Sequence, residues 1–231
     1  MTSHSHHGAP VAPSPSSATP PASVRQVPAW RLLATLAIAG AGSGALVVSV
    51  YRVTLPAVQR YAGQQAQQAI REVLKAPARW DTLYLVGGRL VAIAPAGSDL
   101  RELSKAFVGR DREGKRTGVA VTAQEPGFQE ELSLMIGFEP ETGSLIGIKV
   151  LDQKETPGLG DKIETDSGFR GQFAGRVTPL RGVKGRAPTG PSEVQTITGA
   201  TISSRAVVRI VNNAVARWRP LVLASDSTVS R

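Results

Sequence analysis

The chain has 231 residues, 41% of them apolar, and a formal charge of +9, so it can hold one ordinary domain with appendages. It contains no cysteine, which excludes disulfides, thiolate metal sites, iron–sulfur ligation and a cysteine nucleophile. Its histidines are His4, His6 and His7, so the rest of the chain has no imidazole for a catalytic triad, a haem or a zinc site. Redox chemistry would therefore need an organic cofactor.

Residues 1–29 are rich in Ser, Pro and Ala, and we expect a disordered tail. Residues 30–52 are predicted to form a transmembrane helix, because twenty uncharged residues at helical rise span about 30 Å. Trp30 and Tyr51 suit the two membrane interfaces. A cleaved signal peptide is the alternative, but the long leader favours an uncleaved single-pass anchor. The flanking arginines balance, so charge does not set the orientation.

Residues 53–79 are predicted to form a helix that connects the span to the domain and ends before Pro77. Its apolar side chains recur at helical spacing, with glutamines at most other positions. We expect this stripe to pack on the protein's own sheet rather than lie on the membrane surface. The stripe consists of Val58, Tyr61, Ala62, Ala66, Ala69, Ile70, Val73 and Leu74.

Residues 80–220 are predicted to form the domain, which begins with short β-like runs separated by turns. Three successive hairpins are indicated. A mainly antiparallel sheet with helices before and after it gives the fold class α+β. A last helix is predicted to end at Pro220, leaving residues 221–231 as a tail. The paired runs are 83–86 with 90–93, 106–108 with 118–122, and 132–138 with 145–151.

Residues 198–204, with the sequence Thr-Gly-Ala-Thr-Ile-Ser-Ser, form a hydroxyl-rich turn before a predicted helix. A turn that enters a helix presents free N–H groups and the positive end of the helix dipole, which favour a phosphate. The small residues let a phosphate approach closely, and Thr201 would offer its hydroxyl there. The alternative is a plain N-cap with no ligand.

Residues 155–163, with the sequence Glu-Thr-Pro-Gly-Leu-Gly-Asp-Lys-Ile, form a second turn motif. Pro157 fixes one backbone dihedral and the glycines permit a tight turn. The same glycines would let the side chain of Leu159 lie flat against a ring. Taken alone, the pattern favours a plain turn.

Together the two motifs resemble those of the G subunit of Rnf-type electron transport complexes and of the C subunit of the sodium-pumping NADH:quinone reductase. Residues 198–204 resemble their flavinylation motif, and residues 155–163 resemble a second signature about forty residues earlier. In that family the last threonine of the motif, here Thr201, carries FMN through a phosphoester. The family usually has an aspartate three residues before the motif, where this chain has Gln195.

The resemblance implies covalently bound FMN on Thr201. The lack of cysteine, and of histidine beyond His7, argues separately against a metal site, and no catalytic residue is assigned. The resemblance also implies that Thr198, Gly199 and Ala200 shape the attachment loop. Ser203 and Ser204 would hydrogen-bond the phosphate or cap the helix. The aromatic residues Phe169 and Phe173 are expected in the core. The facing wall of the flavin site would consist of Glu155, Thr156, Gly158, Leu159 and Gly160.

The function implied is that of a membrane protein which relays electrons in an ion-translocating oxidoreductase complex. The domain would lie outside the cytoplasmic membrane, with the N-terminus in the cytoplasm. Expected partners are the other subunits, membrane lipid and a flavin transferase that uses FAD and magnesium. Nucleic acid is not expected, because no basic run with interleaved aromatic residues is present. The alternatives are a flavoprotein of another respiratory chain, a regulatory flavin domain, and a non-redox anchored binding module.

Overall fold

The computed structural model describes residues 28–100 and 103–229, so the predicted disordered tail and its histidines lie almost wholly outside the described residues. The chain divides into two compact units, residues 1–55 and 56–231. The first described helix, α1 (Ala29–Val73), begins in the first unit and ends in the second. The predicted span and connecting helix are therefore one continuous helix, with Pro56 inside it.

Helix α1 is the one helix within residues 28–100 and 103–229 that is long and apolar enough to cross a membrane. The side chains of its most apolar window are not buried in the protein. The hydroxyls of Thr35, Ser49 and Thr54 each donate to a carbonyl one turn earlier in the helix, at 2.7 to 2.9 Å. Because these polar groups are satisfied within the helix, they cost little in an apolar environment.

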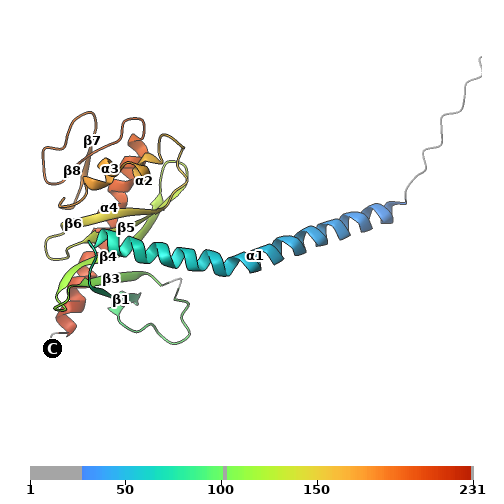
Figure 1. The fold of residues 1–231 in the computed structure, drawn as a ribbon, viewed down its shortest axis with the longest axis horizontal. Helices are drawn as coiled ribbons and strands as arrows, with labels where there is room; N and C mark the ends of the chain where they lie inside the picture. Colours follow the sequence, from blue (N-terminus) through green and yellow to red (C-terminus); the bar gives the residue numbers. More distant parts are fainter. Residues whose placement is uncertain (1–27, 101–102, 230–231) are drawn as a thin grey trace, which may run out of the picture. The chain divides into compact units, whose positions relative to one another are not determined.

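The second unit contains a six-stranded sheet in the order β2-β1-β3-β4-β5-β6, and every neighbouring pair is antiparallel (Figure 1). The three predicted hairpins are confirmed as the pairs β1–β2, β3–β4 and β5–β6. From β3 to β6 the sheet is a simple meander, as the alternating sequence pattern indicated. The strands are β1 (Arg79–Val86), β2 (Arg89–Val91), β3 (Lys105–Arg110), β4 (Arg116–Pro126), β5 (Glu131–Phe138) and β6 (Leu145–Asp152).

The last turns of α1 pack on one side of this sheet, where Ile70 and Val73 are buried in a small apolar cluster with Met135. Gly137 permits the close approach, since a Cβ there would lie 2.4 Å from the carbonyl oxygen of Val73. The first part of the predicted stripe does not pack on the sheet, because Val58 and Tyr61 are exposed. The expectation for this helix therefore holds only for its end.

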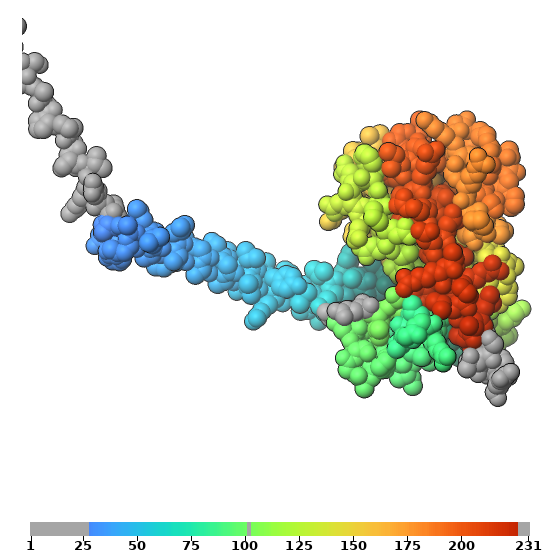
Figure 2. Space-filling model, turned by 180° about the vertical axis from the view of Figure 1, so that it is seen from behind, coloured from blue at the N-terminus to red at the C-terminus, as the bar shows by residue number. Residues whose placement is uncertain are grey.

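The larger core lies between the other side of the sheet and α4 (Thr201–Val229). Helix α4 crosses the surface of the second unit, as its red atoms in Figure 2 show. Val207, Ile210 and Val211 on its inner side are fully buried against side chains from β4 and β5. This amphipathic pattern matches the helical spacing of apolar residues in the sequence.

Helix α4 does not end at Pro220, so the predicted end is wrong and the helix includes most of the predicted tail. A proline in a helix lacks an N–H and removes one backbone hydrogen bond. Here Val222, two residues later, is buried in the core, and Leu221 packs against it. Burial of these side chains stabilises the helix beyond the proline.

Between β6 and α4 the chain forms four short elements that the sequence did not resolve. Phe169 and Phe173 lie in this stretch and were predicted to be in the core. The prediction is confirmed, because both are buried and their rings pack edge to face with centroids 5.3 Å apart. The strands β7 and β8 form a separate parallel pair, which the hairpin pattern did not predict. The elements are α2 (Lys162–Thr165), α3 (Ser167–Gly171), β7 (Arg181–Val183) and β8 (Glu193–Gln195).

Candidate functional site

The hydroxyl-rich motif turns sharply and begins α4 with Thr201 as its first residue. Gly199 has φ +86°, a backbone conformation that other residues rarely adopt. The first helical hydrogen bond runs from Ser204 N to Ala200 O, at 2.9 Å. In the described part of the chain, no hydrogen bond uses the Thr201 hydroxyl, so Thr201 is not an N-cap.

Ser203 and Ser204 are buried, and both hydroxyls are bonded within the protein. Ser204 Oγ donates to Ala200 O at 2.8 Å and accepts from Ile197 N at 3.1 Å, which holds the turn closed. Ser203 Oγ donates to a carboxylate oxygen of Glu155 at 2.8 Å. These bonds use both hydroxyl hydrogens. An anion at this helix end would therefore meet backbone N–H groups rather than serine O–H groups.

Glu155 joins three segments that are distant in the sequence. The residue is only 5% exposed, and its second carboxylate oxygen accepts from Phe128 N at 2.7 Å. With the bond from Ser203, this buried carboxylate connects the β4–β5 turn, its own turn and the start of α4. A buried carboxylate is stabilised only by such hydrogen bonds, so it holds the three segments in one arrangement.

The second motif forms a turn against the first. The carbonyl of Thr156 accepts from Leu159 N at 3.1 Å and from Gly160 N at 2.9 Å. A Cβ on Gly160 would lie 2.7 Å from Glu155 Cβ, so only glycine fits there. Leu159 reaches across to the other motif, since a Cβ on Gly199 would lie 3.3 Å from Leu159 Cδ2. The two sequence motifs are therefore the two walls of one site.

The walls enclose a cleft of about 380 Å³, a volume typical of small-molecule sites. Of the predicted site residues, nine line this cleft, while Gly158 and Ser204 do not. Three further residues line it that the sequence did not indicate: Phe128, Lys184 and Ile202. The predicted residues that line it are Glu155, Thr156, Leu159, Gly160, Thr198, Gly199, Ala200, Thr201 and Ser203.

The three additional residues reach the cleft for different reasons. Ile202 follows Thr201 in α4 and is 59% exposed. Phe128 is an exposed aromatic residue in an otherwise polar turn, a pattern that could have been noticed in the sequence. Lys184 follows β7, and the pairing of Val183 with Gln195 in β8 brings it beside the attachment motif. Only the tertiary structure shows this last proximity.

The segment that leads into the attachment motif is held from two sides. Gln172 clasps the backbone of Gln195, because its side-chain oxygen accepts from Gln195 N at 2.7 Å and its amide donates to Gln195 O at 3.3 Å. On the other side, Arg186 donates to both carboxylate oxygens of Glu193, at 2.8 and 2.6 Å. These bonds, with one from Thr189 N, lower the pKa of Glu193 to about 2.

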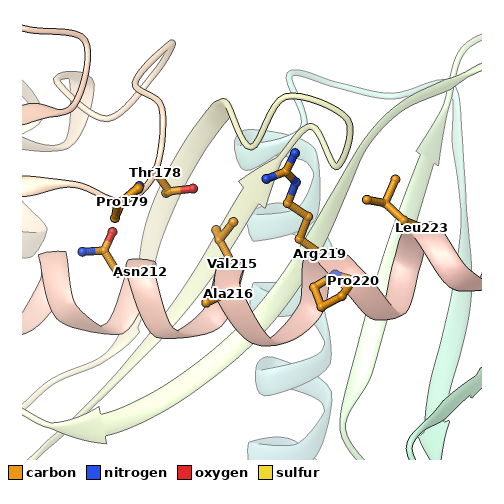
Figure 3. A pocket seen from close by; sticks show the side chains of 8 residues that line it. All are labelled: Thr178, Pro179, Asn212, Val215, Ala216, Arg219, Pro220 and Leu223. Atoms are coloured by element: carbon orange, nitrogen blue, oxygen red, sulfur yellow. The ribbon is translucent and has the colours of Figure 1, made fainter.

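A second hollow lies along α4 and has a volume of about 460 Å³ (Figure 3). Its two main polar side chains are already used by the fold. Asn212 bonds both backbone groups of Leu180, and Arg219 donates to the carbonyls of Pro140 and Glu141, each at 2.7 Å. The hollow therefore offers a ligand little beyond apolar contact, in contrast to the cleft at Thr201.

The residues of the Thr201 cleft fit an FMN group. The helix start and the Lys184 ammonium suit its phosphate, and the apolar side chains of Phe128, Leu159 and Ile202 suit its ring system. The left-handed turn at Gly199 leaves room for close approach of the phosphate, where a side chain would strain the backbone. Within the described residues no cluster of acidic or histidine side chains suited to a metal ion is present.

Comparison with known proteins agrees with this geometry. The sequence profile of the FMN-binding domain family matches residues 127–216, which begin beside Phe128 and include both motifs. Two solved structures have the same fold. The chain matches NqrC of Shewanella oneidensis with a TM-score of 0.55 at 18% identity, covering 64% of this chain and 89% of that protein. It matches the C subunit of the Na⁺-translocating NADH-quinone reductase of Parabacteroides distasonis with a TM-score of 0.53 at 20% identity, covering 71% and 94%.

Relatives found by sequence have a higher sequence identity to this chain than the two solved structures do. The G subunit of the ion-translocating oxidoreductase complex of Vibrio vulnificus is 31% identical over 187 residues, covering 78% of this chain and 85% of the relative. The G subunit of the Na⁺-translocating ferredoxin:NAD⁺ oxidoreductase complex of Acetobacterium woodii is 29% identical, covering 80% and 88%. The corresponding G subunit from Methanosarcina acetivorans is 28% identical, covering 80% and 92%. With its FMN-binding domain, its apolar N-terminal helix and this extent of similarity, the chain belongs to the family of G subunits of ion-translocating oxidoreductase complexes.

Proposed function

We propose that this protein is a membrane-anchored flavoprotein that carries FMN on Thr201 and relays electrons within an ion-translocating oxidoreductase complex. Its family membership and the match to the FMN-binding domain support the electron-transfer role. The observation that carries the attachment site is the unbonded Thr201 hydroxyl at the start of a long helix, inside the cleft where both motifs meet. FMN would supply one- and two-electron chemistry that the side chains lack.

Different residues of the cleft would bind different parts of the FMN. Thr201 is the phosphoester acceptor. The N–H groups of Thr201, Ile202 and Ser203 make no bond within the described residues, so they are available to the phosphate oxygens. Thr198, Gly199 and Ala200 shape the turn, while the turn from Glu155 to Gly160 forms the opposite wall. A covalent bond would prevent loss of the cofactor into the surrounding solution.

Attachment would require a separate flavin transferase acting outside the cytoplasm with FAD and magnesium, as the family resemblance implies. Helix α1 would anchor the chain in the cytoplasmic membrane with the N-terminus inside, and the domain would face the other side. The remaining partners would be the other subunits of the complex and the surrounding lipid. The relatives described above are each named as a subunit of such a complex, which supports this assignment.

The test is flavin attachment in the full-length protein, produced together with a flavin transferase. Mass spectrometry should find FMN on the peptide that contains Thr201, and the denatured band should fluoresce in a gel. Thr201→Val should abolish the fluorescence, because no ester can form. Thr198→Val is the matched control, since it removes a neighbouring hydroxyl that also lines the cleft, and it should retain most of the flavin.

Two results would contradict the proposal. Retained flavin in Thr201→Val would show that another residue is the acceptor. A dark band for the unsubstituted protein, with the transferase shown to be active on another substrate, would leave a membrane-anchored module without a redox role.

A further inference from the structure

The mouth of the Thr201 cleft exposes three large apolar side chains. Phe128 is 57% exposed, Leu159 is 49% exposed and Ile202 is 59% exposed, and all three line the cleft. They come from three separate segments, so the fold brings them together and they are not one apolar stretch of sequence. Exposed apolar clusters of this kind mark contact surfaces in soluble domains.

Unpaired positive charge surrounds these apolar side chains. Lys184 lines the cleft itself, and Lys162, the first residue of α2, donates its backbone N–H to Leu159 O at 3.3 Å. Arg205 is one helical turn after Thr201, and its Cγ would lie 3.7 Å from a Cβ on Gly182, in β7. Within residues 28–100 and 103–229, none of these three cations takes part in a hydrogen bond or ion pair, and all three are exposed.

The acidic groups nearby are mostly buried or paired with cations. Glu155 lines the cleft, but it is only 5% exposed and both carboxylate oxygens accept hydrogen bonds. Asp161, beside Lys162, is partly buried, and its Oδ1 is buried without a hydrogen-bond partner among the described residues. The more accessible carboxylates near the cleft are paired: Glu130 with Lys154 at 2.7 Å, Glu125 with Arg209 at 3.2 Å, and Glu193 with Arg186 at 2.6 Å. The mouth therefore presents an apolar centre with three exposed, unpaired cations near it, while the acidic groups beside it are less exposed.

We infer that this mouth is the docking surface for a negatively charged electron-transfer protein, an inference that rests on the proposed flavin at Thr201. Any redox partner must approach the cleft to exchange electrons with a group held there. Lys162, Lys184 and Arg205 would steer an acidic partner toward the opening, and the parts of Phe128, Leu159 and Ile202 that the flavin leaves exposed would be covered on contact. Anionic lipid also attracts cations, but lipid bound here would block the approach of an electron carrier.

The chain offers a matched control for the charge effect. Arg89 is exposed on β2 and, within the described residues, forms no ion pair. It lies beside Leu221 and Ala224, toward the other end of α4. Twenty residues of helix separate Thr201 from Leu221, a length of about 30 Å. Arg89→Glu changes the net charge as much as Lys184→Glu does, but more than a Debye length from the cleft at physiological salt.

The first experiment needs no flavin. Full-length protein without attached flavin is placed in neutral-lipid nanodiscs with labelled isoleucine and leucine methyl groups. Hexacyanochromate(III), a paramagnetic trianion, should broaden the NMR signals of Ile202 and Leu159 more than hexaamminechromium(III), a paramagnetic trication. The signal of Ile93, which is 85% exposed and lies outside the cleft, should show a smaller preference for the anion.

The second experiment uses flavinylated protein in the same nanodiscs, reduced and then mixed with an oxidant in a stopped-flow instrument. Each reduced flavin gives two electrons and releases two protons, so it converts two ferricyanide ions to ferrocyanide. At low salt, Arg205→Glu, which does not line the cleft, should slow this reaction about tenfold and accelerate oxidation by hexaammineruthenium(III). Lys162→Glu should act in the same direction, whereas Arg89→Glu should change either rate less than about twofold.

The outcomes separate the two proposals. Loss of the anion preference at Ile202 in Lys184→Glu, with its retention in Arg89→Glu, would support the docking surface even if no flavin were attached. Equal broadening by the two chromium probes, or equal effects of the two substitutions, would overturn it. Loss of the Ile202 signal on adding phosphatidylcholine vesicles with about one quarter phosphatidylglycerol would also overturn it, because lipid would then be the occupant.

Discussion

At the scale of single residues, the site depends on Glu155, a buried carboxylate with three different segments around it. Its bonds to Phe128 N and to Ser203 Oγ connect parts of the chain that are 27 and 48 residues away. The family resemblance selected Glu155 as a wall residue, but it did not identify these partners. The structure indicates a second role, in which Glu155 positions the start of the helix that carries Thr201.

Gly160→Ala should damage this arrangement. The new methyl group would lie 2.7 Å from Glu155 Cβ and 2.8 Å from its Oε2, so the carboxylate must move away from Ser203. We expect a loss of about 1–3 kcal/mol in the free energy of unfolding, with reduced flavin attachment. Urea denaturation followed by tryptophan fluorescence, with a parallel measurement of flavin per protein, checks this.

The control for that substitution is Gly171→Ala in α3, where no atom lies within 4 Å of an added Cβ. Its effect on stability should stay within about 0.5 kcal/mol. A Gly160→Ala protein as stable and as fully flavinylated as Gly171→Ala would show that the close packing around Glu155 is not required.

At the scale of secondary-structure elements, the attachment motif is positioned by a small parallel pair, β7–β8. Two three-residue strands are too short to be stable without support. The side chain of Gln172 supplies that support, because it bonds the backbone of Gln195 as a neighbouring strand would. Gln195 occupies the position where the family usually has an aspartate. In this chain, the Gln172 side chain bonds the backbone of Gln195.

Gln172→Ala should release the segment before Thr198. Removing the side chain leaves two backbone groups of Gln195 without partners, at a cost of about 1–3 kcal/mol. Hydrogen exchange should become faster at residues 194–197 while the central sheet keeps its protection. Gln68→Ala, at an exposed position of α1, is the control and should leave exchange unchanged. Unchanged exchange in Gln172→Ala would mean that the clasp contributes nothing to the order of this segment.

The extension of α4 beyond Pro220 is a second feature of this scale. A proline near an apparent helix end predicts termination, and the sequence supports that interpretation locally. The buried side chain of Val222 outweighs this local preference, because it belongs to the core cluster that α4 shares with the sheet. Packing therefore decides where this helix ends, even against the local signal of a proline.

Val222→Ala tests this packing. Val222 is only 1% exposed, so losing its two methyl groups should lower the free energy of unfolding by about 1–3 kcal/mol. Leu223→Ala changes a neighbouring side chain that is 39% exposed, and its cost should be smaller. Both are measured by urea denaturation. An equal or smaller loss for Val222→Ala would indicate that this end of α4 is not part of the core.

At the scale of the whole molecule, two helices pack on opposite sides of the sheet: the apolar helix α1 and the helix α4 that begins at the cleft. One side receives the end of α1, and the other receives α4, whose first residue is Thr201. Glu72 in the last turns of α1 bonds Lys149 of β6 at 2.8 Å and Arg170 of α3 at 3.0 Å. The groups are partly exposed, so these pairs orient the helix more than they stabilise it.

The proposed topology can be tested directly because the chain has no cysteine. Single cysteines replace Ser5 near the N-terminus and Ala174, which is exposed in the second unit. A membrane-impermeant maleimide should label Ala174→Cys in intact spheroplasts, and Ser5→Cys only after the membrane is permeabilised. Labelling of Ser5→Cys in intact spheroplasts, with Ala174→Cys protected, would reverse the proposed orientation.

Local sequence patterns were sufficient for the apolar span, the three hairpins and the two turn motifs, because each depends on residues close together in the chain. They also named most residues of the cleft through the resemblance to known flavin proteins. They did not predict the β7–β8 pair, the continuation of α4 past Pro220, or the presence of Phe128 and Lys184 in the cleft. These features arise from contacts between distant segments, where burial and hydrogen bonding outweigh local preference.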